Sequence, residues 1–255
     1  MHSRRVQAEH LMRPVQESAG WDSLPPALRA GIEARAGTVT GTSPVGEGLS
    51  TSVRLILHTG SGDVFVKGTG PESMDYQRDR LQLGADLAPH LAAVSPSLLW
   101  LVQADGWNVT GWPALPGRPW ADLTTSSKDI PKLTSLLADL SEIPAPAILR
   151  GTARQQWEQY SDDPAALDGN AIVHRDSNPT NFVVQPGRAW MVDFGWAIRG
   201  PAWAGAPRHA VDEYASATVR EWERVMERGP LHKMWQLRAS VSRSWASYRE
   251  GSARF

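Results

Sequence analysis

The stretch that decides the fold is residues 171–200, AIVHRDSNPTNFVVQPGRAWMVDFGWAIRG. Its three short apolar runs predict short buried strands, separated by polar turns. The first run ends just before Asp176, the second begins just after Asn181, and the third ends just before Asp193. The pattern therefore predicts three oxygen-bearing side chains on loops at the ends of buried strands.

These three side chains suggest a specific chemistry. Asp176 could accept the proton of a substrate hydroxyl, and Asn181 and Asp193 could hold Mg²⁺ through oxygen ligands. Magnesium is commonly bound by one or two carboxylates together with substrate phosphates, which suits so sparse a set. Gly195 would relieve the backbone just after the metal ligand. A zinc site is excluded because the chain has no cysteine and no suitably paired histidines.

The order His174-x-Asp176-x₄-Asn181, followed by Asp193-Phe194-Gly195, is the kinase catalytic signature. The stretches 174–184 and 192–203 resemble the aminoglycoside phosphotransferase family of small-molecule kinases. That resemblance implies an α+β, two-lobed protein-kinase-like fold, with a small antiparallel-sheet N-lobe and a mainly helical C-lobe. It also implies ATP, with GTP as an alternative, and Mg²⁺. For His174 we expect a packed, structural role.

The upstream half follows the same order. Val53–Thr59 and Val64–Lys67 predict a hairpin around the turn Gly60–Asp63. Lys67 ends its strand, in a chain where only four of 26 basic residues are lysines. The resemblance implies that it contacts the α- and β-phosphates. The loop 46–52 would cover the phosphates with backbone N–H groups and hydroxyls. Its candidate binding residues are Gly46, Gly48, Ser50, Thr51 and Ser52.

Further helices and strands complete the expected organisation. A helix is predicted to begin near Leu24-Pro25-Pro26, with Ser23 as N-cap, and to stop at Gly37. The other expected helices are 75–93, 130–140, 154–161, 209–228 and 231–249; the other expected strands are 98–102, 107–112, 171–173, 182–184 and 189–192. We expect an extension over 1–20, an N-lobe over 21–112 and a C-lobe over 113–255. The linker would be the Pro- and Gly-rich stretch 113–119, with the nucleotide cleft near 111–117.

Two features depart from the family pattern. A kinase lysine normally pairs with a glutamate on the next helix, but 76–91 contains none. Its only carboxylates are Asp79 and Asp86, and a rough alignment puts Gly84 at the glutamate position. In addition, only about 50 residues follow Trp203, whereas many relatives carry a longer helical substrate lobe.

Composition limits the partners. The 255 residues are 41% hydrophobic and 21% charged, and the formal net charge is −1. The chain therefore lacks the overall excess of positive charge that is typical of proteins that bind nucleic acid or an anionic membrane. The N-terminus has no apolar region typical of a signal peptide, so we expect a cytoplasmic protein. The acidic residues Asp162, Asp163 and Asp168 could line a site for a cationic substrate, although a solvated turn is the commoner explanation.

The sequence thus indicates a phosphotransferase that moves the γ-phosphoryl of ATP to a hydroxyl of a small molecule. The acceptor could be an aminoglycoside, another antibiotic, or a metabolite such as an amino alcohol or sugar. A catalytically weak nucleotide-binding protein is the main alternative. A protein kinase is disfavoured, because Ala206-Pro207-Arg208 lacks the glutamate of an activation-segment end. The oligomeric state is left open.

Overall fold

The computed structural model describes residues 18–46, 51–122, 127–160, 163–176 and 178–205. The chain divides into two compact units. The first comprises Met1–Ala121 and Asn178–Trp196, and the second Asp122–Ser177 and Ala197–Phe255. The lobe boundary expected at 112/113 therefore differs from the division between these units. The two expected C-terminal helices and nearly all of the expected extension lie outside the described residues.

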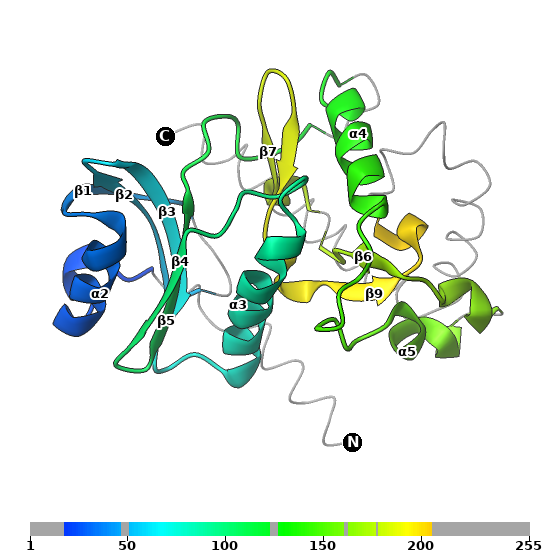
Figure 1. Ribbon diagram of the computed structural model, residues 1–255, viewed down its shortest axis with the longest axis horizontal. Coiled ribbons are helices and arrows are strands. Elements are labelled where there is room, and N and C mark those ends of the chain that lie inside the picture. Colours follow the sequence, from blue (N-terminus) through cyan, green and yellow to red (C-terminus); the bar gives the residue numbers. More distant parts are fainter. Residues whose placement is uncertain (1–17, 47–50, 123–126, 161–162, 177, 206–255) are drawn as a thin grey trace, which may run out of the picture. The chain divides into compact units, whose positions relative to one another are not determined.

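A five-stranded antiparallel sheet forms the centre of the first unit, in the order β1-β2-β3-β5-β4 (Figure 1). Its strands are β1 (Val39–Pro44), β2 (Val53–Thr59), β3 (Gly62–Thr69), β4 (Trp100–Ala104) and β5 (Trp107–Pro113). The four strands given by the sequence are confirmed, apart from shifts of one to two residues at their ends. The edge strand β1 was not specified, because its VTGTSP sequence has little apolar alternation.

Tight turns set the register of this sheet. Asp105 and Gly106 both have positive φ, 49° and 76°, which is the geometry of a two-residue turn between right-twisted strands. The turn at Gly60 and Ser61 places Thr59 opposite Gly62 and Arg54 opposite Lys67. Each residue of β2 therefore shares a face of the sheet with its cross-strand partner on β3, and successive pairs alternate between the two faces.

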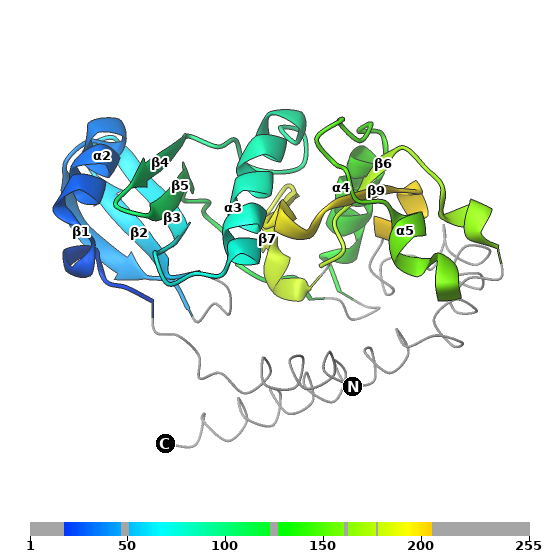
Figure 2. The same cartoon turned by 90° about the horizontal axis from the view of Figure 1, so that it is seen from below.

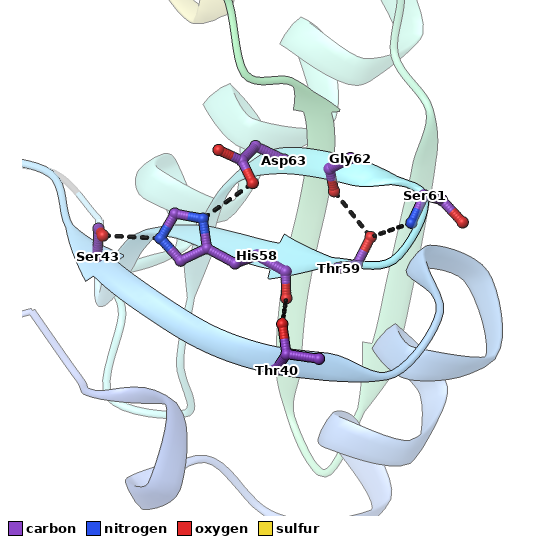
Figure 3. A network of polar contacts seen from close by, with 7 residues as sticks. All are labelled: Thr40, Ser43, His58, Thr59, Ser61, Gly62 and Asp63. Carbon is purple, nitrogen blue, oxygen red and sulfur yellow. Dashed lines mark hydrogen bonds and ion pairs between the residues drawn. The ribbon is translucent and has the colours of Figure 1, made fainter.

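A polar network joins the edge strand to its neighbours near the β2–β3 turn (Figure 3). The His58 ring lies between two side chains: its Nε2 is 2.8 Å from Ser43 Oγ, and its Nδ1 is 2.9 Å from Asp63 Oδ1. The Thr40 hydroxyl donates to the His58 carbonyl at 3.1 Å. These bonds join β1, β2 and β3 through side chains as well as through the backbone ladder.

Helix α2 (Pro26–Ala36) covers one face of the sheet (Figures 1 and 2). Buried side chains of the helix, of the sheet and of Leu24 just before the helix form the core between them: Leu24, Leu28, Ile32, Val53, Leu55, Leu57, Val64, Val66, Trp100, Val102 and Val109. The expected stop at Gly37 is confirmed, with φ of 87°. The expected N-cap is wrong. Pro25 takes that position, and the Ser23 hydroxyl instead donates to the Gly20 carbonyl within a 3₁₀ turn.

Helix α3 (Asp75–Leu87) lies on the other side of the sheet from α2 (Figures 1 and 2). It is shorter than expected and ends in the 3₁₀ turn η2 (Ala88–His90). The first unit also contains the hairpin of β7 (Phe182–Val184) and β8 (Ala189–Met191). Arg118 exchanges two backbone hydrogen bonds with Val184, of 3.0 and 2.9 Å, so the stretch expected as a linker runs along β7.

The second unit contains α4 (Ile130–Ser141), α5 (Ala153–Trp157) and a strand pair, β6 (Ala171–Val173) with β9 (Ile198–Gly200). Leu133, Leu136 and Leu140 bury one face of α4, as the apolar spacing predicts. Helix α5 is shorter than the predicted 154–161.

Besides η2, the described residues of the two units form further 3₁₀ turns. These are η1 (Trp21–Ser23), η3 (Glu158–Tyr160), η4 (Pro164–Leu167), η5 (Pro179–Asn181), η6 (Phe194–Trp196) and η7 (Ala202–Gly205).

Candidate active site

Lys67 and Asp193 form the centre of the candidate site in the first unit. Lys67 lies on β3, with its side chain on the face opposite to α2. Its Nζ donates to Asp193 Oδ1 at 2.8 Å, although 126 residues separate the two in sequence. The Lys67 side chain is 16% exposed and that of Asp193 is 45% exposed. The structure therefore brings the predicted phosphate-binding lysine onto the predicted metal ligand.

The β7–β8 hairpin places Asn181 beside Asp193. Asn181 ends the turn before β7 and Asp193 follows β8, and the Val192 N–H donates to the Asn181 carbonyl at 2.9 Å. Asp193 has a φ of 67°, a left-handed conformation that Asp and Asn tolerate better than most residues. Two of the three predicted oxygen side chains thus come from neighbouring positions at one end of a hairpin.

The donors at this hairpin end suit Mg²⁺. A carboxylate and an amide oxygen are hard ligands of the kind that this ion binds in proteins. Within the described ranges, no group of three His, Cys, Asp or Glu side chains could hold a metal by itself. Additional ligands would have to come from phosphate oxygens and water, as is usual for magnesium at nucleotide sites.

Helix α3 packs against the Asp-Phe-Gly segment without the usual glutamate. A Cβ on Gly195 would lie 2.8 Å from the Arg80 carbonyl oxygen, so only glycine allows this close approach. Gly84 faces the same segment, since its Cβ would lie 3.9 Å from the Gly195 nitrogen. The Asp86 carboxylate accepts a hydrogen bond from Gln82 Nε2 at 2.8 Å on its own helix. Lys67 is therefore held by Asp193, with no ion pair to Asp86 or Asp79 among the described contacts.

The described residues of the predicted phosphate loop lie at its two ends. Gly46 is exposed at its start and Thr51 is half-buried near its end. The Ser52 hydroxyl is buried, accepts from the Gly70 N–H at 3.0 Å and contacts Ser73 Oγ at 2.9 Å. Gly48 and Ser50 lie outside the described residues.

Asp176 belongs to the second unit, where it follows β6. Its backbone N–H donates to Nδ1 of His174, at 3.2 Å, and the His174 side chain is fully buried. The accepting nitrogen must be unprotonated, so this bond favours the neutral imidazole. Arg175 between them has φ of 67°. His174 thus orients the backbone of the loop that carries Asp176, in keeping with the structural role expected for it.

The acidic residues considered for substrate binding make local contacts. Asp163 caps η4, accepting from the Ala165 and Ala166 N–H groups at 3.1 and 3.4 Å. Asp168 pairs with Arg154 at 2.7 Å. Asp162 lies outside the described residues. The described contacts are those of a helical turn with a surface ion pair.

The sequence analysis did not identify the side chains that surround Lys67 on its face of the sheet. Arg54 is directly opposite Lys67, while Phe65 pairs with both Ile56 and Trp112 in the register. All these side chains share a face, so an apolar, aromatic strip lies next to two cations. The turn predicted over Gly60–Asp63 did not reveal this pairing, which follows from the shorter, two-residue turn at Gly60 and Ser61.

Comparisons with known proteins support the fold. No protein-family model and no curated protein sequence matches the chain. Among solved structures, it is similar to a putative fructosamine-3-kinase from Haemophilus somnus 129PT, with 12% identity and a TM-score of 0.52 over 85% of this chain and 90% of that one. Thermostable aminoglycoside phosphotransferase APH(4)-Ia variants in ternary complexes give TM-scores of 0.50 at 14% identity. One complex holds ADP and hygromycin B, over 87% of this chain and 91% of that one. The other holds AMP-PNP and hygromycin B, over 89% and 93%.

The chain therefore has the α+β, two-lobed fold of protein-kinase-like phosphotransferases. This confirms the fold class that the family resemblance implies. At identities this low, the likeness establishes the architecture, and the chemistry has to be argued from the site residues. None of the helices in the described part of the chain is long and apolar enough to span a membrane.

Proposed function

We propose that the protein is an ATP- and Mg²⁺-dependent phosphotransferase that transfers the γ-phosphoryl group to a hydroxyl of a small molecule. The observation that carries this proposal is the Lys67–Asp193 contact of 2.8 Å, with Asn181 at the neighbouring hairpin position. These groups match the parts of a magnesium nucleotide. The lysine suits the phosphates, the carboxylate and the amide suit the metal ion, and the neighbouring apolar side chains suit the base. The kinase-like fold adds support.

Each part of the nucleotide would meet a different part of the first unit. The apolar side chains of Ile56, Phe65 and Trp112, two of them aromatic, offer a surface for a base. Lys67 supplies a fixed positive charge to the phosphates. The loop 46–52 would cover the phosphates through Gly46, Gly48, Ser50, Thr51 and Ser52.

Asn181 and Asp193 would hold Mg²⁺, which when bound neutralises charge on the β- and γ-phosphates. Asp176 would orient the acceptor hydroxyl and take its proton. A bond forms between the acceptor oxygen and the γ-phosphorus while the bond from that phosphorus to the ADP oxygen breaks. The proton goes to Asp176. Most of the catalytic effect in such a reaction comes from positioning and electrostatics.

The acceptor is proposed only as a class, a small molecule with a hydroxyl group. An aminoglycoside, another antibiotic and a metabolite such as an amino alcohol or sugar all fit this chemistry. Asp162 and Asp163 are the proposed contacts for a cationic acceptor. We place the reaction in the cytoplasm, where ATP is available, and propose neither nucleic acid nor a membrane as a partner. GTP is the alternative phosphoryl donor.

A catalytically weak nucleotide-binding protein is the second candidate. It is favoured by the absence of a glutamate on α3. Among the contacts described, Asp193 is then the one carboxylate that pairs with Lys67. The two candidates differ in turnover: a binding protein would hold Mg·ATP without transferring phosphate to any hydroxylated compound.

The test is phosphate transfer from γ-labelled ATP to a panel of aminoglycosides, amino alcohols and sugars. We expect the wild type to label at least one acceptor. Asp176→Asn should lower kcat by about 10²- to 10⁴-fold, the usual contribution of a general base, and leave Mg·ATP affinity unchanged. Loss of ATP affinity in this variant would show that Asp176 is structural. Nucleotide binding without labelling of any acceptor would favour the second candidate.

A further inference from the structure

Arg54 and Lys67 place two positive charges side by side on one face of the sheet. They are direct cross-strand partners in the β2–β3 register. Side chains in this relation lie on the same face with their Cβ atoms about 4.5–5.5 Å apart, and like charges so placed repel each other. A sheet that keeps two cations in this position gains most when an anion binds between them.

The Arg54 side chain also holds the start of the predicted phosphate loop. Its Nη2 donates to the Gly46 carbonyl at 2.6 Å and its Nε to the Val45 carbonyl at 3.3 Å. At the other end of the loop, the Ser52 N–H donates to the Gly68 carbonyl at 2.8 Å. A guanidinium carries five N–H donors in a planar fork, so one arginine can bind loop carbonyls and a phosphate together.

The charge of Arg54 is coupled to the same carboxylate that Lys67 contacts. Burial lowers the pKa of Arg54 from its usual value, and the negative charge of Asp193 opposes this by raising it. Arginine remains protonated throughout the physiological range. Two cations, on β2 and β3, therefore act on the single carboxylate of Asp193, and a polyanion such as a nucleotide phosphate chain would be attracted to both.

We infer that Arg54 is a second phosphate-binding residue, which joins the loop at Val45 and Gly46 to the nucleotide phosphates. This inference rests on the proposed nucleotide site and adds a residue to it. The ligand group is a di- or triphosphate bound as its magnesium complex. The planar guanidinium matches phosphate oxygens in a two-point manner that a lysine cannot reproduce.

The experiment is a calorimetric titration of Mg·ATP, Mg·ADP and adenosine into the wild type, Arg54→Met and Arg54→Lys. Arg54→Met should weaken Mg·ATP and Mg·ADP binding by about 10- to 100-fold, the usual loss for hydrogen bonds to a charged group. Adenosine affinity should stay unchanged. Arg54→Lys should fall between the two, because it keeps the charge and loses the fork. It also provides a second test if the methionine variant folds poorly.

Arg35→Met is the matched control, because Arg35 is an exposed arginine of α2, on the opposite face of the sheet. It should leave all three affinities unchanged. The inference is overturned if Arg54→Met and Arg54→Lys bind Mg·ATP as the wild type does. It is equally overturned if adenosine and Mg·ATP lose affinity by the same factor, since Arg54 would then only shape the loop. Failure of the wild type to bind any nucleotide would instead refute the proposed function itself.

Discussion

At the scale of single residues, the contact between Lys67 and Asp193 joins two side chains that the motifs assign to different tasks. The lysine was expected at the phosphates and the aspartate at the metal, yet the two meet at 2.8 Å. Neither group is fully buried, so the pair contributes little to stability; partly exposed ion pairs contribute up to about 1 kcal/mol. The contact is better explained by the ligand that both groups are expected to bind.

Substitution of Lys67 distinguishes a role in stability from a role in nucleotide binding. Lys67→Met should reduce the free energy of unfolding by less than about 1 kcal/mol but weaken Mg·ATP binding by about tenfold or more. Arg154→Met is the matched control, since it removes an ion pair of similar length, 2.7 Å, to Asp168. It should leave Mg·ATP affinity unchanged. Urea denaturation and calorimetry measure both quantities, and a Lys67→Met protein that binds Mg·ATP normally would contradict the assignment.

At the scale of elements, the contact between α3 and the Asp-Phe-Gly segment has a glycine on each side, Gly84 and Gly195, and only Gly195 is required by the close packing. Gly195→Ala should lower the free energy of unfolding by about 1–3 kcal/mol, because its Cβ would overlap the Arg80 carbonyl. Gly84→Ala should raise it by about 0.5–1 kcal/mol, because alanine favours the helix and its Cβ would make only an ordinary contact. Thermal unfolding tests both, and equal effects of the two substitutions would mean that α3 packs elsewhere.

The sequence could predict elements whose apolar pattern or turn chemistry was strong. The β2–β3 hairpin, the strands β4 and β5, and α4 all follow from such signals. Weak patterns hid the others: β1 mixes Thr, Gly and Pro, and β9 has only three residues, Ile198–Gly200. β9 also pairs with the earlier strand β6, and local propensity does not reveal that pairing.

In the candidate site too, some features could be predicted from the sequence and others could not. Motif spacing predicts Asp176, Asn181 and Asp193 as site residues, and the position of Lys67 at the end of its strand predicts the lysine. Their pairing could not be predicted, since a contact across 126 residues depends on how the sheet and the second hairpin pack. Arg54 was missed although the hairpin register brings it opposite Lys67. The four-residue turn predicted at Gly60–Asp63 would instead place Ile56 opposite Lys67, whereas the observed two-residue turn pairs Lys67 with Arg54.

At the scale of the whole molecule, the proposed work is divided between the two units. The first carries Lys67, Asn181 and Asp193, and the second carries Asp176. Nucleotide binding and phosphate transfer should therefore be separable by substitution. Loss of Lys67, Asn181 or Asp193 should weaken Mg·ATP binding and phosphate transfer together, whereas loss of Asp176 should lower transfer alone.

The most direct measurement is a calorimetric titration of Mg·ATP into the wild type, Asp193→Asn and Asp105→Asn. Both aspartates have positive φ, which asparagine tolerates, so each substitution removes a charge with little backbone strain. We predict Mg²⁺-dependent binding to the wild type and to Asp105→Asn, and an affinity lower by about tenfold or more in Asp193→Asn. Mg·ATP binding that is unaffected by Asp193→Asn, or no nucleotide binding to the folded wild type, would contradict a magnesium nucleotide site in the first unit.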